Sequence, residues 1–133
     1  MALDLPPLPL YERVFGTAWM KWLRVLRDRL VIGENWQFVT FQNSWTDYSA
    51  TEAAGYYKDI FGRVHMKGLI KGGAPPSVAF VLPEEYRPAF TVRLSTVALS
   101  AFGYIYIESN GNVTIQVGST TWTSLDNISF KAA

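Results

Sequence analysis

The chain has 133 residues, which is enough for one domain with a small appendage. Twelve basic and eleven acidic residues give a formal net charge of +1, so no overall field attracts nucleic acid, anionic lipid or an acidic substrate. The absence of cysteine excludes disulfides, thiolate nucleophiles and cysteine-based metal sites.

The first segment, residues 1–9, contains prolines at positions 6, 7 and 9. Each proline ring fixes φ and removes a backbone donor, which predicts an extended arm and excludes a helix. The segment also lacks a basic start and an uninterrupted apolar run, so we do not expect it to act as a signal peptide.

Residues 10–33 carry the pattern of an amphipathic helix. Apolar residues recur at steps of three and four, whereas Arg13, Lys21 and Arg24 fall on the other side. The helix is expected to end near Gly33. Its apolar stripe, the candidate trimer interface, comprises Phe15, Trp19, Leu23, Leu26 and Leu30.

Three roles stay open for this helix. It can form a short trimeric bundle, although its stripe covers only about two heptads and a sustained coiled coil needs about three or four. It can instead pack on the protein's own sheet, as amphipathic helices of small domains commonly do. It can also lie on a membrane surface through its tryptophans and arginines, an interpretation that Glu12 and Asp28 weaken.

The composition favours self-association. Hydrophobic residues make up 49% of the chain and aromatic residues 15%. Charged residues make up only 17%, below the roughly 25% that is typical of soluble domains. Such an apolar excess is most easily buried between copies of the same chain, so we expect an oligomer.

From residue 36 onward, short β-rich runs alternate with turn residues. Apolar and polar side chains alternate around Gly68, which is expected to interrupt one strand. Asn110 and Gly111, between two alternating runs, predict a hairpin. These runs predict a mainly β fold, an antiparallel β-sandwich or barrel. The expected strands are residues 36–42, 62–71, 77–82, 90–99, 103–108 and 113–117, and a last strand with Ile128 and Phe130 after a turn at 124–127.

The residue types do not assemble an obvious catalytic centre. His65 is the single histidine, and its position between Arg63 and Lys67 on one strand face predicts a solvated surface group. The sequence has neither HxH nor HExxH spacing, so we expect no metal site and no cofactor. Glu84 and Glu85, which could serve glycoside hydrolysis, lie in a proline-flanked turn where solvation is expected. We therefore expect a protein that is not an enzyme.

A cluster of aromatic and short polar side chains between residues 43 and 57 is the candidate binding site. Aromatic faces beside small polar groups commonly hold sugar rings. The same aromatic rings can instead pack an interface between subunits or cover the end of a barrel. The candidate saccharide-binding residues are Asn43, Trp45, Asp47, Tyr48, Tyr56 and Tyr57.

Four phrases between residues 55 and 133 occur in a characteristic order. They are YKD at 57–59, GRVHMKG at 62–68, AFVLPEEYRP at 79–88 and WTSLDNISF at 122–130. In this order they resemble the C-terminal head domains of trimeric phage tail fibres and receptor-binding proteins. Such heads usually terminate a longer fibre, whereas this chain begins only about fifty residues before the resemblance. We therefore expect a separate short fibre, a baseplate part or a capsid decoration protein built on the same head.

The resemblance implies a homotrimeric virion protein in which residues 36–133 form a β-head that attaches to host-surface saccharide. Residues 10–33 would then form the trimerising shoulder. Residues 1–9 would be an arm that docks onto another virion structural protein. The alternative is a capsid decoration (cement) protein with a purely structural role. Neither nucleic acid nor membrane insertion is expected.

Overall fold

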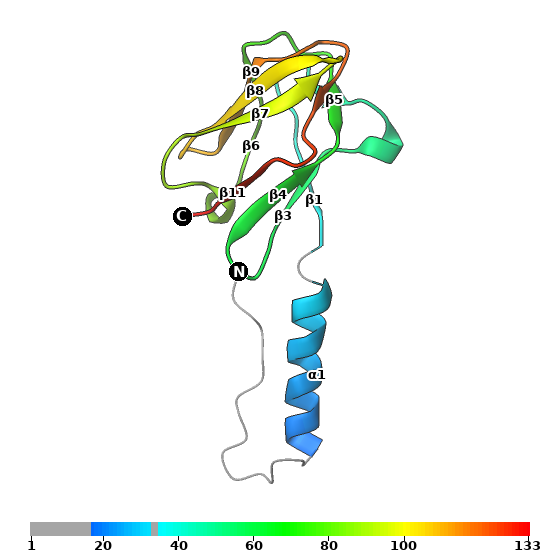
Figure 1. The fold of residues 1–133 in the computed structure, drawn as a ribbon, viewed down its shortest axis with the longest axis vertical. Helices are drawn as coiled ribbons and strands as arrows, with labels where there is room; N and C mark the ends of the chain where they lie inside the picture. The colour runs from blue at the N-terminus through cyan, green and yellow to red at the C-terminus, as the bar shows by residue number, and fades with distance from the viewer. Residues whose placement is uncertain (1–16, 33–34) are drawn as a thin grey trace.

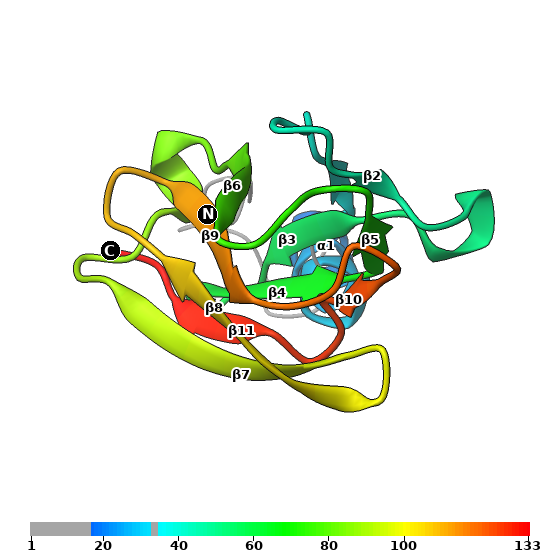
Figure 2. The ribbon, with the colours of Figure 1, turned by 90° about the horizontal axis from the view of Figure 1, so that it is seen from above.

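The computed structural model describes residues 17–32 and 35–133, which form one helix and a head of short antiparallel strands (Figure 1). The helix projects from the head, and a view along the long axis shows it end-on behind the strands (Figure 2). The predicted mainly β architecture with a preceding helix is confirmed. The structure holds a single chain, so the homotrimer stays a prediction.

Helix α1 runs from Thr17 to Ile32, within the predicted range of 10–33. Residues 1–16, with the expected arm and Phe15, lie outside the described residues, as does the side chain of Leu30. Trp19 and Leu26 are half-buried, whereas Leu23 is 46% exposed. No described residue of α1 belongs to the hydrophobic core, so the interpretation that the stripe packs on the protein's own sheet is wrong for these residues. Within the described part of the chain, no helix has the length and apolar character needed to span a bilayer.

Three antiparallel sheets make up the head, and their strands come from distant parts of the sequence. The sheet nearest the helix has the order β1 (Gln37–Phe38), β3 (Gly55–Lys58), β4 (Arg63–Lys67) and β11 (Ser129–Lys131). A second sheet has the order β10 (Thr123–Ser124), β5 (Leu69–Lys71) and β2 (Thr46–Asp47). The third has the order β6 (Ser77–Val81), β9 (Asn112–Val117), β8 (Ala101–Ile107) and β7 (Val92–Ala98).

Gly68 marks the point where the chain passes from one sheet to another. The predicted single strand at residues 62–71 is two strands, β4 and β5, that pair with different partners. Gly68 has a φ of 108°, and an added Cβ would lie 2.7 Å from the carbonyl oxygen of Ala53. Glycine alone combines this left-handed backbone with such a close approach. The predicted interruption is therefore confirmed, and it is a change of sheet.

One hydrophobic core joins the three sheets. Side chains alternate between the two faces of most strands, so each sheet turns one face toward this core. The outer faces also carry exposed apolar side chains, among them Val97 and Phe102. Burial of large aliphatic and aromatic side chains supplies most of the stability of such a head. The largest fully buried side chains are those of Trp45, Val64, Ile70, Phe80, Leu82, Ile105, Ile107, Val113, Ile115, Thr123, Leu125 and Ile128.

The Asn110–Gly111 hairpin forms as predicted and packs against a corner of the chain. Gly111 has a φ of 95°, and an added Cβ there would lie 2.5 Å from the carbonyl oxygen of Leu82. The corner is a short 3-10 helix, Glu84–Tyr86, followed by Arg87, whose Nε donates to the same Leu82 carbonyl at 2.8 Å. The hairpin and the corner therefore both pack around the Leu82 carbonyl.

The C-terminal strands frame an exposed turn. The expected last strand is β11. The short strand β10, which precedes the turn and pairs with β5, is not predicted by any sequence pattern. Leu125 and Ile128 are buried at the two ends of the turn, and between them Asp126 and Asn127 are exposed. Asn127 adopts a φ of 66°, a left-handed conformation that asparagine tolerates better than most residues.

Candidate functional site

A row of side chains crosses the outer face of the sheet nearest the helix. Tyr57 of β3 is the cross-strand partner of His65 of β4, and His65 is the partner of Ser129 of β11. Trp36, which precedes β1, extends the row, because its ring lies edge-on to Tyr57 with centroids 4.6 Å apart. The imidazole of His65 stacks on Tyr57 with centroids 5.0 Å apart and planes 21° apart. Four segments of the chain thus place aromatic and polar groups in one line.

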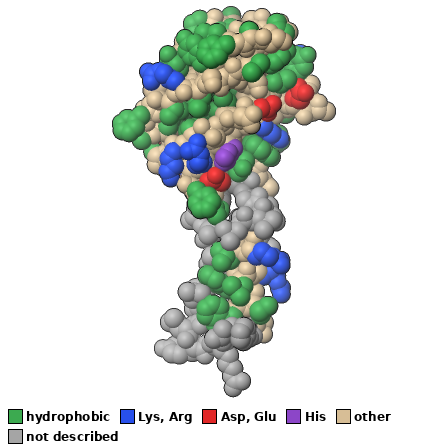
Figure 3. Space-filling view, in the orientation of Figure 1, with side chains coloured by type: hydrophobic (Ala, Val, Ile, Leu, Met, Phe, Trp, Pro, Cys, Tyr) green, Lys and Arg blue, Asp and Glu red, His purple; other side chains and the backbone are tan. Residues whose placement is uncertain are grey.

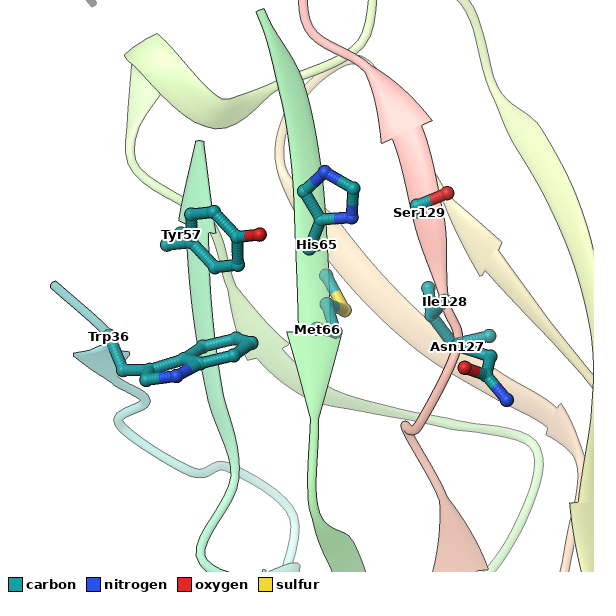
Figure 4. A pocket seen from close by; sticks show the side chains of 7 residues that line it. All are labelled: Trp36, Tyr57, His65, Met66, Asn127, Ile128 and Ser129. Atoms are coloured by element: carbon teal, nitrogen blue, oxygen red, sulfur yellow. The ribbon is translucent and has the colours of Figure 1, made fainter. Parts of the chain in front are cut away.

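This row borders an open cavity of about 300 Å³, which we call the Trp36 pocket (Figure 4). The largely buried side chains of Met66 and Ile128 contribute apolar lining, and the Met66 N–H donates to the Ile128 carbonyl at 2.9 Å. The amide of Asn127 and the hydroxyl of Ser129 lie on the side opposite Trp36 (Figure 4). The pocket is lined by Trp36, Tyr57, His65, Met66, Asn127, Ile128 and Ser129.

Asp59 fixes the imidazole of the pocket. Its Oδ2 lies 2.8 Å from His65 Nε2, and its Oδ1 accepts the backbone N–H groups of Phe61 at 2.9 Å and Arg63 at 3.0 Å. Burial raises the pKa of the Asp59 carboxyl, but the hydrogen bonds from His65, Arg63 and Phe61 outweigh it, so this pKa lies below its ordinary value of 3.8. Asp59 is therefore a carboxylate at neutral pH, and it holds His65 in one orientation.

Basic side chains surround the row. Lys67 places its Nζ 4.8 Å from the centre of the Trp36 ring, a cation–π contact. Arg63 Nη2 donates to the Ser129 hydroxyl at 3.1 Å. The space-filling view shows the histidine on this face between basic and acidic groups (Figure 3). The site thus combines aromatic faces, hydrogen-bonding groups and positive charge.

Two of the six predicted saccharide-binding residues are core residues. Trp45 is 1% exposed, and its Nε1 donates to Ser77 Oγ at 2.8 Å. Tyr56 is 6% exposed and packs edge-on against Tyr86, with centroids 4.9 Å apart. Neither ring is open to a ligand from solvent in this chain. The assignment of these two residues to a surface site is therefore corrected, because their faces belong to the core.

The remaining candidates do not form one cluster. Asn43 donates from Nδ2 to the Val78 carbonyl at 2.8 Å, and Asp47 Oδ1 accepts the Ala54 N–H at 2.7 Å, so both fix the backbone. Tyr48 is 40% exposed and lies under Lys71, away from the pocket lining. Tyr57 alone of the six lines the Trp36 pocket.

Sequence reasoning missed the partners of Tyr57. The sequence predicts Trp36 only as the start of a strand and His65 only as a solvated surface group. The structure leaves the His65 side chain 33% exposed, with Tyr57 on one face and Asp59 on its edge. The one signal in the sequence was that His65 lies on the outward-facing side of its strand. The residues opposite it depend on strand register, which no local pattern reveals.

The site does not have the geometry of a nucleophile with its base. Asp59, His65 and Ser129 are the residue types of a hydrolytic triad, in which the hydroxyl must donate to the imidazole. The Ser129 hydroxyl accepts from Arg63 instead, and Figure 4 shows it directed away from the imidazole. Among the described residues, no cluster of histidine and acidic side chains could hold a metal ion. The arrangement suits binding better than bond cleavage.

Comparison with known proteins gives one informative similarity. No protein-family model and no curated protein matches the chain. Among solved structures, the chain is similar to the receptor binding protein (gp15) of Listeria phage PSA, with a TM-score of 0.62 and 21% sequence identity. The fold is that of a phage receptor binding protein. At 21% identity, the similarity shows a shared fold and does not extend to ligands or individual site residues.

The similarity is not confined to the head. It covers 92% of this chain and 82% of the phage protein. The head alone, residues 35–133, is too short to supply that coverage, so the aligned region reaches into the residues before it.

Proposed function

We propose that this chain is a phage virion protein whose β-head attaches to saccharide on the host surface through the Trp36 pocket. Two independent observations support a place on the virion. The four ordered phrases in residues 55–133 resemble phage receptor-binding heads, and the whole fold is similar to a protein described as the receptor binding protein of a phage. We propose a position in the tail on the support of the same similarity.

The row of Trp36, Tyr57, His65 and Ser129 is the observation that carries the saccharide proposal. Sugar rings present apolar C–H faces and a rim of hydroxyls, so they bind where an aromatic wall stands beside donors and acceptors. The rings of Trp36 and Tyr57 provide such a wall, and His65, Ser129 and the amide of Asn127 provide polar groups next to it. The hydrogen bond that His65 Nε2 donates to the Asp59 carboxylate restrains the imidazole before any ligand arrives, which lowers the entropic cost of binding.

We also propose that three copies assemble through α1. Leu23 is 46% exposed and Met20 is 48% exposed in the single chain. Apolar side chains on a projecting helix are readily buried against the same helix of other copies. In this proposal residues 1–9 dock onto another virion structural protein, and the head acts without cleaving its ligand.

Binding to an array of bacterial surface glycans tests the proposal. The purified protein should bind at least one saccharide, and Trp36→Ala should weaken that binding about fivefold, since an aromatic contact contributes on the order of 1 kcal/mol. Tyr48→Ala is the matched control, because Tyr48 is an exposed aromatic residue outside the pocket. Equal loss in both variants would contradict the assignment of the site. A protein that ignores every glycan and every bacterial cell but binds virus shells would instead favour the capsid decoration role.

A further inference from the structure

A second depression lies on the other side of the exposed turn at residues 125–128. It has a volume of about 360 Å³ and is distinct from the Trp36 pocket, but the two share Asn127 as a lining residue. Its walls come from β7, β8 and β10 and from the turn. The lining residues are Ser95, Thr96, Val97, Phe102, Ser124, Asp126 and Asn127.

The second depression, like the first, combines an aromatic ring with polar side chains. Phe102 is 66% exposed and offers an aromatic face. Ser95 and Asp126 are exposed polar groups in the same lining. Thr96, in contrast, uses its hydroxyl to donate to the Ser124 carbonyl at 2.6 Å and thereby joins β7 to β10. An aromatic face beside hydroxyl and carboxylate groups again suits a sugar ring.

The turn between the two depressions is held in place from several sides. The Leu125 N–H donates to the Gly68 carbonyl at 2.7 Å, and Asp126 Oδ1 accepts the Gly68 N–H at 3.0 Å. The Asp126 N–H donates to Ser124 Oγ at 3.1 Å. No hydrogen bond joins the amide of Asn127 to another described residue, so its donors and its acceptor face outward between the depressions. Because the backbone of the turn is already held in place, a hydrogen bond from a ligand to the Asn127 amide costs little conformational entropy.

We propose that the two depressions are subsites of one groove, so that the ligand is an extended saccharide polymer and not a single terminal sugar. This inference rests on the proposed saccharide function. One part of the polymer would stack on Trp36 and Tyr57, the next would pass Asn127, and a further unit would lie against Phe102. Each unit beyond the first adds contact area without a second loss of translational freedom, so affinity must rise with chain length.

Chain-length dependence of binding is the test. The probes are disaccharide, tetrasaccharide and octasaccharide pools, prepared by partial hydrolysis of the bacterial surface polysaccharide that gives the strongest array signal. Isothermal titration of the full-length protein should show affinity rising about tenfold from the disaccharide to the octasaccharide, which corresponds to about 1.4 kcal/mol. Phe102→Ala should remove most of this rise and leave disaccharide binding unchanged, because Phe102 lines only the second depression. Asn127→Gly, which removes an amide that both depressions share, should weaken the binding of all three pools.

The variants are chosen to keep the fold intact. Phe102 is largely exposed, and glycine adopts the positive φ of Asn127 without strain. Phe90→Ala is the matched control, because Phe90 is 82% exposed and lines neither depression. It should keep the full dependence on length.

Three outcomes would overturn the inference. Affinity could be the same for all three pools, or Phe102→Ala could bind like the wild type. Phe102→Ala could also lower the mass of the assembled protein, which would mean that this surface contacts another copy. Failure of the protein to bind any saccharide is a different result, because it removes the proposed function itself.

Discussion

The imidazole of His65 lies almost flat against the ring of Tyr57, with centroids 5.0 Å apart and planes 21° apart. The two residues are direct partners in the β3–β4 ladder, so the stacking follows from the register of the sheet. His65 Nε2 also forms a hydrogen bond with Asp59 Oδ2, and the two atoms lie 2.8 Å apart. The aromatic wall is thus supported by an imidazole that is bound to a carboxylate, and this carboxylate is itself fixed by backbone N–H donors.

The lowered pKa of Asp59 predicts a specific loss of stability in acid. A carboxyl whose pKa is lower in the folded than in the unfolded protein stabilises the fold above its unfolded pKa, and this contribution is lost as pH falls through the folded pKa. The loss should therefore lie below the ordinary value of 3.8. Asp59→Asn should lower the Tm at neutral pH, and its Tm should fall less steeply than that of the wild type below about pH 3.8. Thermal unfolding between about pH 5 and pH 2 measures both effects.

The control for that experiment is Glu84→Gln, which removes an exposed carboxyl from the 3-10 helix Glu84–Tyr86. It should keep the wild-type profile. An Asp59→Asn profile that runs parallel to the wild type at every pH would show that Asp59 does not contribute to the acid transition.

Gly68 and Gly62 provide a matched pair for backbone strain. Both have a positive φ, 108° and 83° respectively. An added Cβ at Gly68 would meet the backbone of Ala53 and Ala54, whereas at Gly62 it would meet only the flexible end of Lys131. Gly62→Ala should therefore cost about 1 kcal/mol, and Gly68→Ala should cost about 3 kcal/mol or more. Urea unfolding measures both, and equal losses would show that Gly68 is not packed as described.

Thr114 is a position where removal of a polar group should not harm the protein. It is 8% exposed, and its Oγ1 is buried without a hydrogen-bond partner among the described residues. Replacement by the isosteric valine removes the desolvation cost of that hydroxyl, so Thr114→Val should leave stability unchanged or raise it by about 1 kcal/mol.

Thr123 is the contrasting case for this measurement. It is fully buried, and its Oγ1 accepts the Ser119 N–H at 2.9 Å and donates to the Ser119 carbonyl at 3.1 Å. Thr123→Val leaves both groups of Ser119 without their partner and should cost about 1–3 kcal/mol. A larger loss for Thr114→Val than for Thr123→Val in the same unfolding assay would refute the account of both hydroxyls.

The proposed assembly through α1 predicts the mass of the protein in solution. Light scattering should give about three times 15.0 kDa. Leu23→Glu places a charge on the exposed apolar stripe and should shift the protein toward the monomer, because a buried unpaired charge is costly. Lys21→Glu changes the exposed polar side of the same helix and should preserve the larger mass. A monomeric wild-type protein at micromolar concentration would refute the trimer.

Local features of the fold could be predicted from the sequence, because their signals lie within a few residues. The Asn110–Gly111 hairpin and the interruption at Gly68 both depend on backbone conformations that few residues adopt. The mainly β fold followed from short runs with a period of two. Those features are set by neighbours in the chain.

The candidate site could not be predicted in the same way, because it is assembled by strand register. The site takes residues from three strands: Tyr57, His65 and Ser129. The sequence around any one of them does not indicate which residues lie opposite it in the sheet. The contrast between Trp45 and Trp36 makes the same point. Both are tryptophans next to short strands, yet one is 1% exposed in the core and the other is 37% exposed at the pocket. Which tryptophan is buried depends on the packing of three sheets.

The most direct test of the saccharide site uses the tryptophans as reporters. The chain has five tryptophans, so a protein labelled with fluorotryptophan gives few ¹⁹F resonances to assign by single substitution. Fragments of the bound polysaccharide, added to the full-length protein, should shift the Trp36 resonance and leave that of the buried Trp45 in place. Saturable binding that leaves the Trp36 resonance unmoved would place the ligand elsewhere and contradict the account.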